Sequence, residues 1–303
     1  MLARWFHRRG WSDMVIGVPY FWLLIFFLIP FLIVVTISFA TRTPTAPPFG
    51  FGGENPAVNL TGYARFFIDE LYVRAFVTSL VNAGVAMLLC LALGYPMVLG
   101  LTRVEKGWRN ILLMLVILPF WTSFLLRVYA WMGLMGSNSS FNRLLTEGWN
   151  WLVPQAWAMN NIPLMHTNFA VVLVMVYTCL PFMILPLYAN LERLDTTHEE
   201  AAMDLGSHPF AVFRDITLPQ SIRGIIAGGM LVFIPAAGEL VIPIPVGDAS
   251  APMIGRVISD EFTSARDWPM ASSVAVALLI LMAGPMMLYS HFEARAQHRE
   301  KFE

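Results

Sequence analysis

Long stretches without charged residues dominate this chain and limit what it can fold into. Crossing about 30 Å of hydrocarbon takes a helix of roughly 20 mainly apolar residues. Stretches of this kind occupy residues 15–40, 75–102, 111–136, 168–191, 225–247 and 269–290. Arg127 and Glu239 are the only Arg, Lys, Asp or Glu residues inside them. The runs are continuous rather than alternating, which excludes a membrane β-barrel and predicts six spanning helices.

The composition also indicates that a bilayer, not water, is the solvent of this fold. Of 303 residues, 57% are hydrophobic and 13% are charged, whereas soluble domains carry about 25% charged residues. The mean hydropathy is +0.63. A formal net charge of −1 without any basic block argues against nucleic-acid binding. The sequence therefore excludes a cytosolic enzyme and a disordered chain, and it predicts an all-α integral membrane protein.

The distribution of arginine and lysine predicts the orientation of the spans, because basic residues concentrate in cytoplasmic loops. Twelve lie in residues 1–14, 103–110, 192–224 and 291–303, and six lie in residues 41–74, 137–167 and 248–268. The first group and both termini are therefore predicted to be cytoplasmic. Arg4, Arg8 and Arg9 precede the first apolar run. That run is longer than the 7–15 residues of a signal-peptide core, so we expect it to remain as the first span.

The predicted outer segments have a different character from the spans. Thr43–Gly53 is rich in proline and glycine and is expected to be irregular. Trp149, Trp151 and Trp157 cluster in the next outer segment, where indoles typically lie at the headgroup level. Cys90 and Cys179 both lie within apolar runs, and we predict buried, small apolar roles for them rather than a disulfide framework.

Residues 192–224 form a long predicted cytoplasmic connection, called here the EAA loop, which is too long to lack structure of its own. Thr197 followed three residues later by Glu200 matches a capping box at a helix start. Gly206 suits the left-handed position that ends a helix. A short helix is therefore predicted between Thr197 and Gly206.

A second short helix is predicted over residues 210–216, with Pro209 in its first turn and Pro219 expected to end it. Neither helix is long enough to be stable alone in water. The apolar side chains that need a covering surface are Ala201, Ala202, Leu205, Phe210, Val212 and Phe213. That surface is either the cytoplasmic ends of the chain's own spans or a groove on a cytoplasmic partner.

The EAA loop also carries a spaced motif. Glu200-Ala201-Ala202, three residues, Gly206, nine residues, Ile216, one residue and Leu218-Pro219 resemble the EAA motif of ABC-importer membrane subunits, which precedes the penultimate span in that family. Residues 118–132, 233–239, 253–257 and 266–269 resemble segments of bacterial putrescine/spermidine permeases. One departure follows the fifth span, where residues 245–248 read Pro-Val-Gly-Asp instead of Leu-Leu-Gly-Gly, and this leaves the exact substrate open.

This resemblance implies a type I ABC importer fold with cytoplasmic coupling helices, in which residues 1–303 form one transporter membrane domain. It implies a place in the bacterial inner membrane and import of putrescine or spermidine. The partners that it implies are a second permease subunit, often a different chain, two ATPase subunits and a periplasmic polyamine-binding protein. By position in the motif, coupling to the ATPase falls to Glu200, Ala201, Ala202, Gly206, Leu218 and Pro219.

Sequence features of catalysis are missing from this chain. It has no G-x-x-x-x-G-K-S/T phosphate loop, and its two lysines are Lys106 and Lys301, so ATP and Mg²⁺ are expected to bind a partner ATPase and no cofactor is expected here. His198-Glu199-Glu200 lacks the second histidine of a zinc motif. We therefore predict a transport subunit without catalytic or metal-binding residues. An ABC permease for another small solute and an ion-coupled secondary transporter or channel remain the alternatives.

Glu239 is the candidate for a cation-attracting site in the translocation path. A carboxylate in hydrocarbon costs at least roughly 2.5–3.5 kcal/mol, so it typically faces protein or a water-filled cavity. Tyr129, Trp131 or Tyr177 could add a cation–π contact. The alternative for Glu239 is a structural hydrogen bond, to Arg127 or to a neighbouring helix. Arg127 either extends toward the outer interface or pairs with a carboxylate or with carbonyls, and its positive charge disfavours a role in binding a polyamine.

Overall fold

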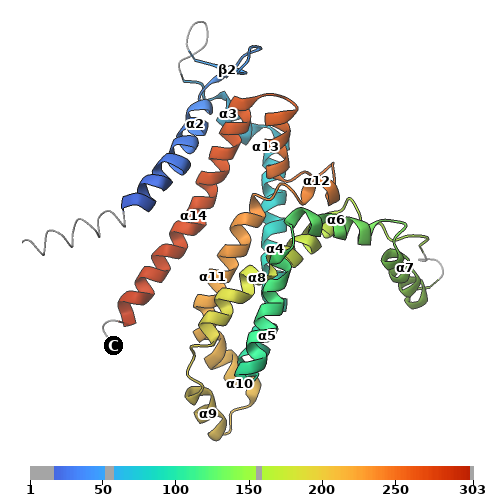
Figure 1. Cartoon of the computed structure of the whole chain (residues 1–303), viewed down its shortest axis with the longest axis vertical. Helices are drawn as coiled ribbons and strands as arrows, with labels where there is room; N and C mark the ends of the chain where they lie inside the picture. The colour runs from blue at the N-terminus through green and yellow to red at the C-terminus, as the bar shows by residue number, and fades with distance from the viewer. Residues whose placement is uncertain (1–16, 52–57, 155–158, 301–303) are drawn as a thin grey trace, which may run out of the picture. The chain divides into compact units, whose positions relative to one another are not determined.

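The computed structural model describes residues 17–51, 58–154 and 159–300, and most of these residues are helical (Figure 1). Arg4, Arg8, Arg9 and Trp157, on which the predicted orientation and aromatic belt partly rest, lie outside these residues. The described chain divides into two compact units. The first comprises the residues up to Glu70 and Ile258–Ile280, and the second comprises Leu71–Val257 and the residues from Leu281 onward.

The first unit contains an apolar helix over Gly17–Ile37, a short hairpin and parts of two further helices. Its elements are the π-helical segment η1 (Leu24–Leu28), α2 (Ile29–Ile37), β1 (Thr41–Arg42), β2 (Phe49–Gly50), α3 (Thr61–Ile68) and the beginning of α14 (Trp268–Glu300). The two strands pair antiparallel. The described part of Thr43–Gly53 is mostly irregular, as predicted, and its regular structure is limited to the two-residue strand β2.

Two contacts hold the first unit together. The Ser273 hydroxyl donates a hydrogen bond to the carbonyl oxygen of Ser38 at 2.9 Å. Arg42 donates to the carbonyl oxygen of Ala265 at 2.6 Å, and its guanidinium lies 3.8 Å from the Asp267 carboxylate. Arg42 and Asp267 come from two segments predicted to lie on the same side of the membrane, and their contact agrees with that grouping.

The second unit is built around two packed helices, α8 and α11. Its elements are α4 (Glu70–Arg103), α5 (Lys106–Ile117), the 3₁₀ turn η2 (Leu118–Trp121), α6 (Phe124–Met135), α7 (Ser140–Leu152), α8 (Asn168–Leu191), α9 (Thr197–Asp204), α10 (Pro209–Val212), the π-helical segment η4 (Phe213–Thr217), α11 (Leu218–Ala237), α12 (Pro243–Val246) and α13 (Ile254–Thr263). Figure 1 shows α9 and α10 at the end of α8 and α11 that lies away from α12.

Helices α8 and α11 pack closely because glycine faces a bulky residue. A Cβ atom at Gly228 of α11 would lie 2.8 Å from the sulfur and 2.9 Å from the carbonyl oxygen of Met183 in α8. Any larger residue at this position would therefore push the two helices apart. Cys90 and Cys179 are buried in the same core, as predicted for small apolar side chains.

Four described helical runs are long and apolar enough to cross a membrane: Gly17–Ile37, α4, α8 and the continuous run Pro209–Ala237. Helix α8 matches the predicted span 168–191 at both ends, and α4 extends beyond 75–102 at both ends. In the predicted sixth span, Trp268–Gly284 is an apolar but shorter helix.

The predicted third span is not one straight helix. It is bent by 89° between Lys106–Trp121 and Phe124–Met135. Pro119 lies in η2, and Thr122 and Ser123 then adopt extended conformations with ψ of 149° and 136°. The helix is therefore interrupted at Thr122 and Ser123, and a continuous apolar run here does not produce a continuous helix.

The predicted fifth span, 225–247, is not one continuous helix either. Its helix α11 begins earlier, at Leu218, and stops at Ala237 before a turn that leads into α12. Glu239 lies in this turn and not inside a spanning helix. Pro243 opens α12, and its ring would clash with the Glu239 carbonyl if α11 simply continued.

Candidate functional site

Helix α9 begins as predicted at Thr197, but its cap differs from the prediction. The Asp195 carboxylate accepts hydrogen bonds from the Thr197 backbone N–H at 2.9 Å and from the Thr197 hydroxyl at 2.6 Å. Glu200 makes no such bond back to the helix start, so the predicted capping box is wrong. These bonds favour the ionised carboxylate, and they lower the pKa of Asp195 below its usual value.

The end of α9 confirms the conformation predicted for Gly206. Its φ is +87°, in the left-handed region. The Gly206 N–H bonds to the carbonyl oxygen of Met203 at 2.9 Å, and the Ser207 N–H bonds to that of Ala202 at 3.0 Å. This pair of bonds is a Schellman motif, which satisfies two carbonyls that the helix end would otherwise leave unpaired.

The second predicted helix starts correctly but does not end at Pro219. Pro209 is the first residue of α10, and His208 Nδ1 accepts from the Phe210 N–H at 3.3 Å. The helical run then passes through η4 into α11, with Pro219 in the first turn of α11. The wider π turn closely precedes Pro219, which lacks the N–H that an α-helix would pair with the preceding turn. The EAA loop therefore continues directly into a membrane helix.

Two hydrogen bonds fasten the EAA loop to that helix and to α4. Thr217 donates its hydroxyl to the Glu199 carboxylate of α9 at 2.6 Å. Further along, the Tyr95 hydroxyl of α4 lies 2.8 Å from the Ser221 hydroxyl of α11. The Tyr95 ring also meets Phe213 edge to face, with centroids 5.6 Å apart. These hydrogen bonds connect α9 to the residue just before α11, and α11 to α4.

The apolar residues of the EAA loop divide between the two surfaces that the sequence left open. Val212 is buried and Phe213 packs on Tyr95, so these residues are covered by the chain itself. Leu205 is 89% exposed. Phe210 is 65% exposed, although its ring lies beside that of Phe213 with centroids 6.4 Å apart.

A hollow of about 560 Å³ lies beside the exposed Leu205. It is lined by His198, Ala201, Ala202, Leu205, Asp215, Ile216, Pro219 and Gln220. At its rim, Arg214 donates to the Asp215 carboxylate at 2.7 Å, and this hydrogen bond lowers the pKa of Asp215. An apolar hollow with a charged rim is a surface suited to a protein partner.

The residues of the EAA motif are all found at this end of the second unit. Ala201, Ala202 and Pro219 line the hollow, and Glu200 is exposed next to them. Gly206 shapes the end of α9, and Leu218 is half-buried where α11 begins. The motif therefore combines residues that form the surface with residues that shape it.

Arg127 lies on α6 with an exposed fraction of only 9%. Its side chain is therefore buried and does not extend into water. Its guanidinium carbon is 5.5 Å from the centroid of the Phe120 ring and 5.7 Å from that of Phe124. Its Nε and Nη1 atoms are buried without a hydrogen-bond partner among the described residues. The predicted carboxylate or carbonyl partner is thus not provided by the described part of this chain.

Among the aromatic candidates for the path, the structure brings two together. Trp131 and Tyr177 meet with ring centroids 5.6 Å apart. Tyr129 is 60% exposed and lies on the opposite face of α6 from Trp131, because two residues turn a helix by about 200°.

Glu239 uses its carboxylate to hold the turn after α11. Its Oε1 atom accepts backbone N–H bonds from Leu240 at 3.1 Å, Val241 at 2.8 Å and Ile242 at 3.3 Å. No ion pair joins Glu239 to Arg127 among the described residues.

Sequence reasoning missed five residues of this site, which are Asp195, Glu199, Thr217, Tyr95 and Ser221. Asp195 had a readable signal, since Asp two residues before Thr is a common local cap. Tyr95 and Ser221 carry no such signal, because they are distant in the sequence and only the packing of α4 on α11 brings them together. Within the described residues, no group of three or more His, Cys, Asp or Glu side chains could hold a metal ion.

Comparison with known proteins gives relatives along the full length of the chain. No family model matches it. The spermidine/putrescine transport system permease protein PotB of Haemophilus influenzae is 34% identical over 296 residues, which cover 98% of both chains. PotB of Escherichia coli K12 is 35% identical over 268 residues, which cover 88% of this chain and 92% of the relative.

A solved structure shares the fold. A chain of a bacterial ABC transporter involved in the import of the acidic polysaccharide alginate superimposes with a TM-score of 0.70. The match covers 95% of this chain and 96% of that chain at 14% identity. A second structure, of a bacterial alginate ABC transporter in complex with a periplasmic protein, gives the same TM-score.

Proposed function

Because this chain belongs to the PotB family of spermidine/putrescine ABC transport permeases, we propose that it forms part of the membrane path by which an ATP-driven importer takes up spermidine or putrescine. One observation carries this proposal: the identity of 34% to a PotB permease extends over 98% of both chains. The chain is a multi-pass membrane transport component, and the chemistry of ATP hydrolysis belongs in a partner chain that has the phosphate loop missing from this sequence.

The EAA loop is the proposed contact with the ATPase subunits. An element that transmits force must be stiff, and α9 is fixed at its start by Asp195 and at its end by the Schellman motif of Gly206. Such an element must also be connected to a membrane helix, and the Glu199 carboxylate of α9 accepts a hydrogen bond from Thr217, the residue just before α11. The exposed Leu205 and the hollow beside it then offer the surface on which an ATPase subunit docks.

The remaining proposed partners are a second permease subunit, a second ATPase subunit and a periplasmic polyamine-binding protein. The periplasmic protein bound to the alginate transporter supports an arrangement in which a binding protein delivers the solute. Twelve basic residues in the segments that include the EAA loop support a cytoplasmic position for that loop and for both termini.

Glu239 is the proposed low-affinity transit site for the ammonium groups of the polyamine. Three N–H bonds concentrate on its Oε1 atom, while no described contact engages Oε2. The carboxylate is half-buried and has no cationic partner among the described residues that a passing ammonium would have to displace. Trp131 is proposed to flank the same path, with Tyr129 outside it. Tyr177 packs against Trp131 and also lines the separate apolar groove described below.

The test is to purify the importer intact through a tag on this chain, identify its subunits and reconstitute it into vesicles. The proposal expects co-purified ATPase chains and ATP-dependent uptake of labelled spermidine or putrescine. Mutating the phosphate-loop lysine of the ATPase should stop uptake. Uptake that persists without ATP would instead indicate a secondary transporter or channel. ATP-dependent uptake of another solute, not competed by polyamines, would overturn the substrate and keep the transporter class.

A further inference from the structure

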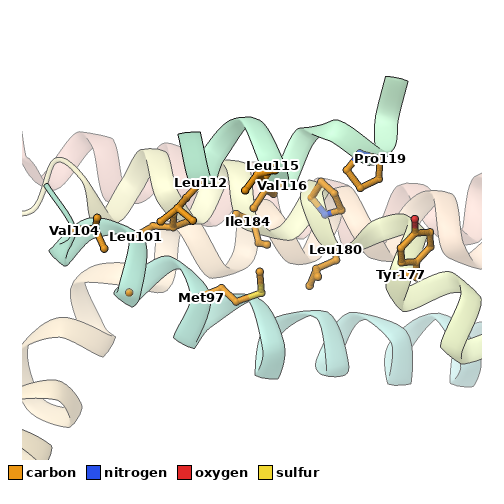
Figure 2. Close-up of a pocket in the computed structure, with 12 residues that line it drawn as sticks. Met97, Leu101, Val104, Leu112, Leu115, Val116, Pro119, Tyr177, Leu180 and Ile184 are labelled. Atoms are coloured by element: carbon orange, nitrogen blue, oxygen red, sulfur yellow. The ribbon is translucent and has the colours of Figure 1, made fainter. Parts of the chain in front are cut away.

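An apolar groove of about 520 Å³ lies between α4, α5 and α8 of the second unit. Figure 2 shows its walls, with Met97 and Leu101 from α4, Leu112 and Leu115 from α5, and Leu180 and Ile184 from α8. The hydroxyl of Tyr177 is the one polar side-chain group among the residues that line it. The EAA loop does not contribute to its walls, so the groove is separate from the proposed coupling surface.

The groove is elongated in the direction of the helices. Its lining runs along α5 and η2 from Leu112 to Pro119, and along α8 from Tyr177 to Ile184. Seven residues of helix correspond to about 10 Å, a third of the roughly 30 Å of hydrocarbon in a bilayer. The groove has the length of part of one lipid leaflet.

The groove is open to the outside of the unit. Leu115 on its wall is 55% exposed and Met97 is 43% exposed. Gly100 contributes no side chain, and no atom lies within 4 Å of the position that a Cβ would take there. An empty space of this size would forfeit dispersion contacts on every wall, so in a bilayer it will be filled by an apolar group.

One end of the groove is at the turn between α4 and α5. Val104 lines the groove, and the exposed Arg103 and Lys106 flank it in the sequence. Arg109 is already engaged with Glu192 at 3.1 Å and with the Thr102 carbonyl oxygen at 2.9 Å.

The turn has an excess positive charge. Arg103 and Lys106 form no ion pair within the described chain, and Glu105 between them leaves an excess of one positive charge. Trp108 in the same turn is 63% exposed, and exposed indoles of membrane proteins typically lie at the level of the headgroups. The turn therefore has the charge and the aromatic residue expected at a lipid headgroup.

We propose that this groove binds one acyl chain of an anionic phospholipid whose phosphate lies beside Arg103 and Lys106. A single negative phosphate matches the excess charge of the turn, and the apolar groove continues from that turn into the bilayer. A helix of the second permease subunit is the alternative occupant of this open groove, and the cross-linking test below distinguishes it from a lipid. A polyamine is excluded by the apolar walls and the positive turn.

The experiment measures lipid retention by native mass spectrometry on the intact importer, exchanged into nanodiscs of phosphatidylglycerol or phosphatidylcholine. Each basic residue near a membrane surface contributes about fivefold to the affinity for anionic lipids. We therefore expect preferential retention of phosphatidylglycerol, and Arg103→Gln and Lys106→Gln should each reduce that preference about fivefold without loss of assembly.

A pair of glycine variants tests the groove itself. Gly100→Leu should fill the groove and remove the retained lipid. Gly84→Leu is the matched control, because Gly84 lies on the same helix and also has no atom within 4 Å of the position that a Cβ would take; it should keep the wild-type lipid. Equal retention in both variants would overturn the proposal. If Gly100→Leu does not assemble, the lipid preference of Arg103→Gln and Lys106→Gln still tests the proposal.

Two further results would refute lipid binding in the groove. The first is wild-type protein that retains both lipids equally. The second is a Leu115→Cys variant that cross-links efficiently to the second permease subunit in native membranes, which would make a protein the occupant of the groove. Absence of that cross-link together with phosphatidylglycerol selectivity supports the lipid.

Discussion

The hydroxyl groups of Tyr95 and Ser221 lie 2.8 Å apart in the buried contact between α4 and α11. Ser221 donates its own proton to the Leu218 carbonyl oxygen at 2.8 Å, so Tyr95 is the donor of the bond between them. This bond lies one helical turn beyond Thr217, where the EAA loop is fastened to α11. The bond therefore links α4 to α11 close to the point where the EAA loop joins α11.

Replacing Tyr95 by phenylalanine should remove that bond and keep the ring against Phe213. We expect Tyr95→Phe to lower the unfolding free energy by about 1 kcal/mol and to lower the amount of polyamine imported per ATP hydrolysed. Thermal unfolding and coupled uptake and ATPase assays measure the two effects. Ser221→Ala should behave alike, and the double variant should be no worse than either single variant. Fully additive losses would contradict the inferred pairing.

Gly206 should tolerate only residues that can adopt its left-handed conformation. No atom lies within 4 Å of a Cβ at this position, so the effect of a substitution comes from φ of +87° and not from a clash inside the chain. We expect Gly206→Val to abolish uptake while the chain remains in the membrane. Asparagine enters the left-handed region more readily, and Gly206→Asn should retain substantial uptake. Immunoblotting of membranes controls for abundance, and normal uptake by the valine variant would refute the role of this turn.

The cap of α9 should be insensitive to pH in the physiological range. The folded-state pKa of Asp195 is lowered, so its stabilising effect is fully present above the unfolded value of about 3.9 and is lost as pH falls through the folded value. Hydrogen exchange of the α9 amides, corrected for intrinsic rates, should be unchanged between about pH 5 and 8. Asp195→Ala should speed exchange several-fold, whereas Asp204→Ala at the other end of α9 should not. Equal exchange in both variants would argue against the cap.

Sequence patterns predicted those features that depend on neighbouring residues or on contact with lipid. The bounds of α8 and the conformation of Gly206 follow from an uninterrupted apolar run and from a local helix-ending signal. The bend at Thr122 and Ser123, just after Pro119, was not predicted, because hydrophobicity reports whether a segment is in lipid and not whether it is straight. Proline alone does not decide the question either, since Pro181 and Pro186 lie inside the continuous helix α8.

The candidate site was predictable in part for the same reason. The spacing of the EAA motif located the surface around Leu205, because that spacing is a local property of the EAA loop. The contact between Tyr95 and Ser221 depends on how two distant helices pack, which a single sequence does not encode in readable form. Glu239 was expected within a membrane span, where a carboxylate is costly, and the N–H bonds of the turn that it accepts offset part of that cost.

Arg127 should matter for assembly or gating more than for the choice of substrate. Its buried guanidinium, near the rings of Phe120 and Phe124, has donors that the described chain does not satisfy, and a positive charge repels a polyamine. We expect Arg127→Leu to reduce recovery of the assembled importer or its substrate-stimulated ATPase several-fold, with the spermidine-to-putrescine uptake ratio unchanged. Arg127→Lys should rescue only in part, because lysine lacks the planar set of donors. A switched uptake ratio in a fully assembled variant would contradict this expectation.

Glu239 can be tested by separating its charge from its hydrogen bonds. In Glu239→Gln the amide oxygen still accepts N–H bonds from the turn of residues 240–242, while the negative charge is gone. In Glu239→Ala both are lost. If the carboxylate attracts the ammonium groups, both variants should slow polyamine uptake at least several-fold, with basal ATP hydrolysis preserved in Glu239→Gln.

A purely structural role predicts a different pattern, in which Glu239→Gln transports normally and only Glu239→Ala is impaired, together with a lower unfolding temperature. The control is Asp248→Asn, since Asp248 also accepts a backbone N–H, from Ser250 at 2.8 Å, but lies in the turn beyond α12. This control should leave uptake unchanged. Initial rates over a range of spermidine concentrations distinguish the cases, because a transit site that attracts the cation should lose rate most at low concentration, where capture by the carboxylate limits the flux.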